Sequence, residues 1–204
     1  MDFRLYVILD RRYLTGDPLV QTQKIIEAGC TVLQYRDKLS SGSDFFYLAG
    51  KLYQIAKKKN IPFIINDRVD IALSLGVEGV HFGADDLPIP AARKLLGSDK
   101  IIGRSVHSLK EARLAENEGA NYVGLGPVFP SQTKTDTGNL IPKEALKELN
   151  EQLRIPVVAI GGIKAENIKE LVKLGIKNFA ICSDILTAAD PAEQVKIIKE
   201  KLVA

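Results

Sequence analysis

The sequence predicts a single-domain (β/α)8 barrel spanning residues 1–204, on three observations. Eight short runs are almost wholly apolar and rich in β-branched residues, which is typical of parallel strands buried on both faces. Amphipathic stretches with helical spacing fill the intervals between these runs. A glycine that follows a helical stretch and precedes a strand recurs four times, as expected for helix C-termini. Strand–helix alternation of this kind implies parallel strands joined by right-handed crossovers.

The expected strands in chain order are 5–9, 31–35, 62–65, 79–82, 101–106, 122–125, 157–160 and 179–182. Between them, apolar residues recur every three or four positions around 48–56, 109–116 and 168–174, with Lys, Arg and Glu on the other face. The recurring glycines are Gly29, Gly76, Gly119 and Gly175. A last helix is expected from Pro191, with Asp190 as its N-cap. An open doubly wound sheet is the alternative, although six strands are more usual there.

Composition narrows the possible functions. Of 204 residues, 46% are hydrophobic and 26% charged, which excludes a disordered chain. The net charge of +3 arises from 28 basic and 25 acidic residues mixed along the chain. We therefore expect no nucleic-acid partner, and small anionic substrates are permitted. Two cysteines are too few for a disulfide scaffold, and the N-terminus resembles neither a signal peptide nor a membrane span. A cytoplasmic protein without a membrane partner is expected.

The strand ends carry the polar residues that matter, because barrel chemistry lies at the C-terminal face. After the second strand, Gln34, Arg36 and Lys38 share one side of an extended segment. Two cations and an amide suit a phosphate or diphosphate. The alternative is a solvated loop in which Asp37 pairs with a neighbouring base.

Carboxylates follow the third and fourth strands. Asp67 comes directly after one strand, and Asp85 and Asp86 come shortly after the next. They suit a hard divalent cation, Mg²⁺, that shares oxygens with a substrate diphosphate. The alternative is that they cap a helix or a turn. His81 lies inside an apolar run and is expected to be a buried, hydrogen-bonded histidine.

The remaining strand ends carry further polar residues, some of which suit phosphate binding. Ser105 and His107 project to one side of the fifth strand, but no acidic third partner is evident for a nucleophilic pair. His107 is left as either a proton shuttle or a cover of the barrel mouth. Residues 127–140 form a long, hydroxyl-rich connection with Lys134, suited to a binding loop. The Gly161-Gly162 pair and Ser183 match the phosphate site common to many barrels.

Together these segments resemble the thiamin phosphate synthase family over nearly the whole chain. They are LQYRDK (33–38), INDRVDIAL (65–73), GVHFGADDLP (79–88), GRSVHSLKEA (103–112), YVGLGPVFPSQTKTD (122–136), PVVAIGGI (156–163) and AICSDI (180–185). The resemblance implies a transferase of thiamin biosynthesis that joins a hydroxymethylpyrimidine diphosphate to a thiazole phosphate with release of pyrophosphate. It also implies a reaction that begins with ionisation of a C–O bond and needs no protein nucleophile.

The resemblance assigns roles residue by residue. Contacts to the pyrimidine diphosphate are implied for Gln34, Arg36, Lys38, Asn66 and Lys134, with Ser105 on the pyrimidine. Ligation of Mg²⁺ is implied for Asp67 and Asp86. The thiazole-phosphate site is implied to contain Ser131, Thr133, Gly162, Cys182 and Ser183. Arg36, Lys38, Lys134 and Ser105 are the implied catalytic residues. The chain departs from the family at Ser131, where threonine is usual, and at Cys182, where an aliphatic residue is usual.

Two other functions remain open at this point. A thiazole tautomerase has the same fold and uses a histidine as acid and base, and the segment GRSVHS with His107 resembles that branch. A tautomerase handles no diphosphate, however, and has no need of Asp67 and Asp86 with Lys38 and Lys134. The third possibility is a barrel that binds a phosphorylated ligand without turnover.

Overall fold

The computed structural model, which describes residues 1–130 and 140–203, is a closed barrel of eight parallel strands. The strands pair in sequence order and β1 pairs with β8, so the barrel closes and the open-sheet alternative is wrong. Their bounds lie within one residue of the predicted runs. They are β1 Tyr6–Asp10, β2 Val32–Arg36, β3 Phe63–Asn66, β4 Gly79–Phe82, β5 Ile101–Val106, β6 Tyr122–Leu125, β7 Val157–Ile160 and β8 Phe179–Ile181.

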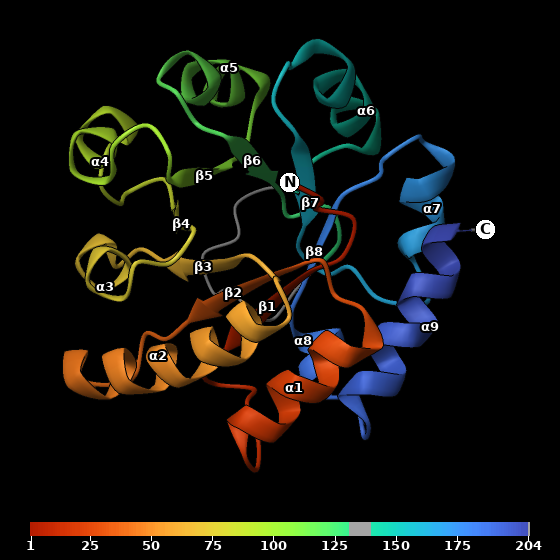
Figure 1. The fold of residues 1–204 in the computed structure, drawn as a ribbon. Helices are drawn as coiled ribbons and strands as arrows, with labels where there is room; N and C mark the ends of the chain where they lie inside the picture. The colour runs from red at the N-terminus through yellow and green to blue at the C-terminus, as the bar shows by residue number, and fades with distance from the viewer. Residues whose placement is uncertain (131–139, 204) are drawn as a thin grey trace.

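Helices surround the strands as an outer ring (Figure 1). They are α1 Pro18–Ala28, α2 Gly42–Lys58, α3 Val69–Leu75, α4 Ile89–Leu96, α5 Leu109–Asn117, α6 Lys143–Gln152, α7 Ile168–Lys173, α8 Ser183–Leu186 and α9 Pro191–Val203. The predicted start of α9 is confirmed, because the Asp190 carboxylate accepts from the Ala192 amide at 2.9 Å. The short helix α8 had no counterpart in the prediction. In the part of the chain that the structure describes, every helix is too short or too polar to cross a bilayer.

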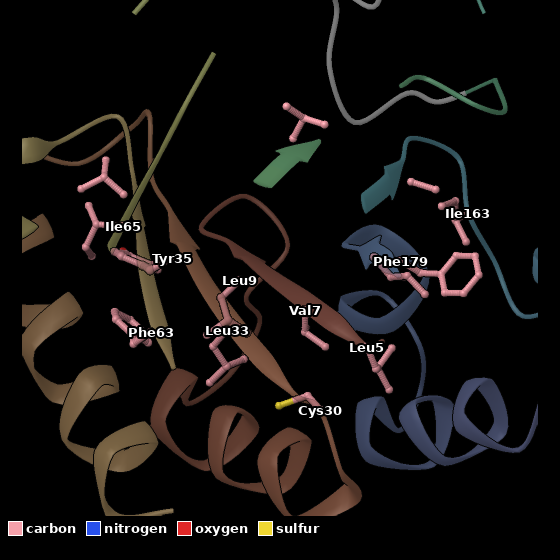
Figure 2. Packing of buried hydrophobic residues seen from close by; sticks show 14 of the residues in the cluster. Leu5, Val7, Leu9, Cys30, Leu33, Tyr35, Phe63, Ile65, Ile163 and Phe179 are labelled. Atoms are coloured by element: carbon pink, nitrogen blue, oxygen red, sulfur yellow. The ribbon is translucent and has the colours of Figure 1, made fainter. Parts of the chain in front are cut away.

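Side chains alternate along each strand between two apolar layers, as the pleat requires. Val7 and Leu9 of β1 and Leu33 of β2 belong to the outer layer, between the strands and the helices (Figure 2). Their neighbours Tyr6 and Val32 belong to a smaller cluster inside the barrel. This alternation sends Gln34 and Arg36 inward and places the polar ends of the strands around one mouth.

Candidate active site

The C-terminal ends of the strands enclose a cavity of about 570 Å³, within the usual range for small-ligand sites. Twelve residues singled out from the sequence line it: Arg36, Lys38, Asn66, Asp67, Asp85, Asp86, Ser105, His107, Gly161, Gly162, Cys182 and Ser183. Gln34 lies deeper and lines an adjoining cavity of about 30 Å³. Ser131, Thr133 and Lys134 lie outside the described residues. The barrel thus places these strand-end residues around one mouth, with Gln34 deeper in the interior.

A buried carboxylate that the sequence reasoning missed organises the cationic side of the cavity. Asp10, at the end of β1, is 2% exposed and accepts from Arg36 Nη1 at 2.5 Å. It also accepts from Arg12 Nε at 3.0 Å and Arg12 Nη2 at 2.9 Å. Burial would raise the pKa of Asp10, but the two guanidiniums lower it below its ordinary value. The carboxylate is therefore ionised and holds both arginines at the cavity.

The signal for Asp10 was present in the sequence. It directly follows the apolar run of the first strand, in the position that Arg36 takes after the second, and the two residues are paired in register. The prediction for Asp37 can also be resolved. Asp37 accepts from the Tyr35 hydroxyl at 2.9 Å and from the Leu39 amide at 2.8 Å, and thus shapes the turn. Among the described residues Asp37 thus bonds a hydroxyl and backbone amides, and not the neighbouring base that the alternative predicted.

Asp67 and Asp86 meet next to this cationic side, at the ends of β3 and β4. The Asp67 carboxylate contacts Lys38 and Asp86 and does not serve as the N-cap of α3, a position held by Arg68. Asp67 also has a left-handed backbone with φ of 61°. The Asp86 carboxylate accepts from the Gly83 amide at 2.7 Å, so it closes the turn after β4 as well as lining the cavity.

The two carboxylates perturb each other. Burial, together with the neighbouring Asp86, raises the pKa of Asp67. Burial alone would raise the pKa of Asp86, but hydrogen bonds from Asp67 and from the Gly83 amide lower it. Two adjacent carboxylates beside Lys38 are a donor set that a divalent cation would satisfy. Within the described residues, no group of three or more His, Cys, Asp or Glu side chains could hold a metal. The pair suits Mg²⁺, which usually takes few protein oxygens and completes its shell with phosphate and water.

The far side of the cavity is built from the ends of β7 and β8. Gly162 has φ of +63°, and a Cβ there would lie 2.4 Å from the Pro130 carbonyl oxygen and 2.6 Å from that of Phe129. The paired glycine thus lets the chain after β7 pack directly against the backbone after β6. Cys182 and Ser183 adjoin it at the end of β8. Burial raises the pKa of the Cys182 thiol to about 12, so this cysteine is neutral and unsuited to nucleophilic attack.

The two histidines occupy different environments. His81 is 7% exposed and bonds Tyr122 and Ser105, which confirms the prediction of a buried, hydrogen-bonded residue. His107 lies at the cavity rim, where its Nδ1 is 2.6 Å from the Gly126 carbonyl oxygen. Since a carbonyl only accepts, His107 Nδ1 carries a proton.

Comparison with known proteins shows what the chain resembles. A family model described as thiamine monophosphate synthase matches residues 5–185. The thiamine-phosphate synthase of Shouchella clausii is 41% identical over 99% of this chain and 95% of that protein. That of Clostridium novyi is 44% identical over 93% of this chain and 94% of its own length.

Solved structures agree with the sequence comparison. The thiamine phosphate pyrophosphorylase from Pyrococcus furiosus superposes with a TM-score of 0.89 and 34% identity, covering 98% of this chain and 96% of its own. Fold and sequence similarity thus agree over nearly the whole length. The chain belongs to the thiamine monophosphate synthase family.

Proposed function

We propose that this protein is a transferase of thiamin biosynthesis that joins a hydroxymethylpyrimidine diphosphate to a thiazole phosphate and releases pyrophosphate. One observation carries the proposal: a single cavity has cations and paired carboxylates on one side and the glycine-rich ends of β7 and β8 on the other. That arrangement suits a metal diphosphate and a second phosphate in the same space. The relatives named above support the same reaction.

The proposed reaction begins when the C–O bond between the pyrimidine methylene and the diphosphate ionises, after which the thiazole nitrogen adds to the methylene carbon. Arg36 and Lys38, with Lys134, stabilise the negative charge that grows on the departing diphosphate. Asp10 keeps the Arg36 guanidinium oriented before substrate arrives. No protein nucleophile is required, which agrees with the neutral thiol of Cys182.

Asp67 and Asp86 are the residues that would hold Mg²⁺. When bound, the ion adds positive charge next to the leaving diphosphate and fixes its orientation. Lys38 contacts Asp67, so the lysine is anchored beside the place proposed for the diphosphate.

The other contacts complete the proposal. Gln34, Asn66 and Ser105 hold the pyrimidine end of the first substrate, and Gly162, Cys182 and Ser183 hold the thiazole phosphate with Ser131 and Thr133. Holding both substrates over one mouth supplies proximity and orientation. We also propose a cytoplasmic location, which the free thiols of Cys30 and Cys182 support.

The tautomerase alternative, with His107 as acid and base, finds no support in the relatives named above, all of which carry synthase or pyrophosphorylase names. The proposal is tested by mixing purified protein with both substrates and Mg²⁺, and measuring pyrophosphate and thiamin phosphate with and without chelator. Metal-dependent formation of both products is the expected result. Proton exchange on the thiazole without pyrophosphate release, or binding without turnover, would contradict the proposal.

A further inference from the structure

Five polar side chains form a continuous hydrogen-bonded chain across the barrel interior. Gln34 Nε2 lies 2.6 Å from Tyr6 Oη, which lies 2.9 Å from Tyr122 Oη. Tyr122 Oη lies 3.0 Å from His81 Nδ1, and His81 Nε2 lies 2.9 Å from Ser105 Oγ. All five residues are buried, at 9% exposure or less, and Ser105 alone among them lines the large cavity.

The direction of each bond follows from the donors available. Tyr6 accepts from the Gln34 amide, and Tyr122 Oη is the acceptor that the described residues offer to the Tyr6 proton, so Tyr6 donates to Tyr122. The Tyr122 proton then goes to His81 Nδ1. A neutral histidine that accepts at Nδ1 carries its proton on Nε2, which therefore donates to Ser105 Oγ. The Ser105 hydroxyl keeps its own proton for an acceptor, and the cavity is where a ligand supplies one.

The barrel interior makes room for this chain. A Cβ at Gly103 of β5 would lie 2.2 Å from Tyr122 Cζ and 2.5 Å from His81 Nδ1, so only glycine permits the contact. The Phe3 ring packs on Tyr122 with centroids 4.5 Å apart. Burial also raises the pKa of the Tyr6 and Tyr122 phenols, which keeps both hydroxyls protonated and able to donate.

We propose that Tyr122 and His81 are positioning residues that make Ser105 a hydrogen-bond donor toward the substrate. The ligand group at Ser105 must then be an acceptor. This step rests on the proposed function, whose pyrimidine substrate carries an amino group as well as its ring nitrogens. Because the amine is itself a donor, the group at Ser105 is a ring nitrogen. The chain thereby selects the face and edge of the ring that enter the site.

The first test is made on ligand-free protein by ¹⁵N NMR of the histidine rings. The sequence has only two histidines, and a His107→Gln variant assigns their signals. We expect the His81 proton to lie on Nε2, with Nδ1 accepting from Tyr122. In Tyr122→Phe the donor to Nδ1 is lost and the Nδ1-protonated tautomer should appear. Tyr53→Phe is the matched control, because Tyr53 is buried but bonds Gly76 and Glu78 instead.

A wild-type His81 protonated on Nδ1, or a tautomer unchanged in Tyr122→Phe, would overturn the proposal. Since no substrate is present, this outcome does not depend on the synthase assignment. If the His81 tautomer is as expected but the protein releases no pyrophosphate, the proposed function fails. The role of the hydrogen-bonded side chains in orienting Ser105 then still stands.

The second test separates positioning from a purely structural role. In His81→Leu the donor to Ser105 is lost, and kcat/KM for the pyrimidine diphosphate should fall about 10-fold or more while the KM for thiazole phosphate is unchanged. His81→Gln, whose amide donates at a similar reach, should recover part of that loss. Equal losses for both substrates, or no recovery with Gln, would contradict the proposal. If His81→Leu does not fold, the same comparison in Tyr122→Phe decides.

Discussion

Gly162 is a position where a single methyl group should harm both the fold and the site. In Gly162→Ala the new Cβ would lie 2.4 Å from the Pro130 oxygen and 2.6 Å from the Phe129 oxygen, which are backbone atoms that cannot rotate away. The residue also has φ of +63°. A left-handed conformation costs an alanine about 1–2 kcal/mol. Overpacking of a tight site adds about 1–3 kcal/mol.

The expected loss of unfolding free energy is therefore about 2–5 kcal/mol, or roughly 4–20 °C in Tm for a chain of this size. Gly175→Ala is the matched control: its φ is +82°, but a Cβ there would meet nothing within 4 Å. The control carries the conformational cost alone, about 1–2 kcal/mol. The difference between the two variants isolates the steric contribution of the contact with residues 129 and 130.

Chemical denaturation followed by circular dichroism measures both variants, and pyrophosphate release measures their activity. The Gly162 variant should also show a raised KM for thiazole phosphate, because the backbone beside that proposed site must shift. The Gly175 variant should not. If Gly162→Ala is no less stable than Gly175→Ala, the close backbone approach is not what requires glycine there, and our reasoning about this end of the cavity is wrong.

Three further predictions concern the charged groups. Asp86→Asn should raise the Mg²⁺ concentration for half-maximal activity about 10-fold or more, and an unchanged metal titration would exclude Asp86 as a ligand. Lys38→Ala should change the unfolding free energy by less than about 1 kcal/mol, since the Lys38 side chain is 52% exposed. The same variant should raise the KM for the diphosphate substrate about 10-fold. Parallel denaturation and kinetic measurements separate the two effects, and an unaltered KM counts against the assignment of Lys38 to the diphosphate. Asp10→Asn should lower the unfolding free energy by about 3–5 kcal/mol at pH 7, because two guanidiniums lose their buried partner. The folded pKa of Asp10 is lowered, so its contribution is present above the unfolded value of about 3.9 and is lost as the pH falls through the folded value. The gap between wild type and Asp10→Asn should thus narrow below about pH 4, and a gap independent of pH would show that the charge of Asp10 is not its source.

The barrel was predictable because its signals are local and repeated. A strand buried on both faces must be apolar along its length, so the eight runs could be identified to within one residue. The same regularity located the site, since parallel strands bring their C-terminal ends to one mouth. Arg36, Asp67 and Ser105 could therefore be grouped before their contacts were known.

The exceptions are polar groups whose importance depends on a partner far away in the sequence. Asp10 reads as an ordinary residue after a strand until Arg36 is seen 2.5 Å away. Tyr6 and Tyr122 read as core aromatics until their hydroxyls are found 2.9 Å apart, 116 positions apart in the chain. Side-chain hydrogen bonds of this kind leave no periodic trace, because each depends on a single pair of atoms.

The sequence by itself thus determined the architecture of this protein, the mouth at which the candidate residues lie and the family to which the chain belongs. Only the tertiary structure decided that Asp67 lies against Asp86 and does not cap α3. It also showed that the close approach of neighbouring backbone requires a glycine at position 162, and that Ser105 ends a buried series of hydrogen-bond donors. The physical reason is that hydrophobic periodicity acts over a few neighbouring residues and is written along the chain. Charge pairing, close packing and the direction of hydrogen bonds arise only when distant strands meet.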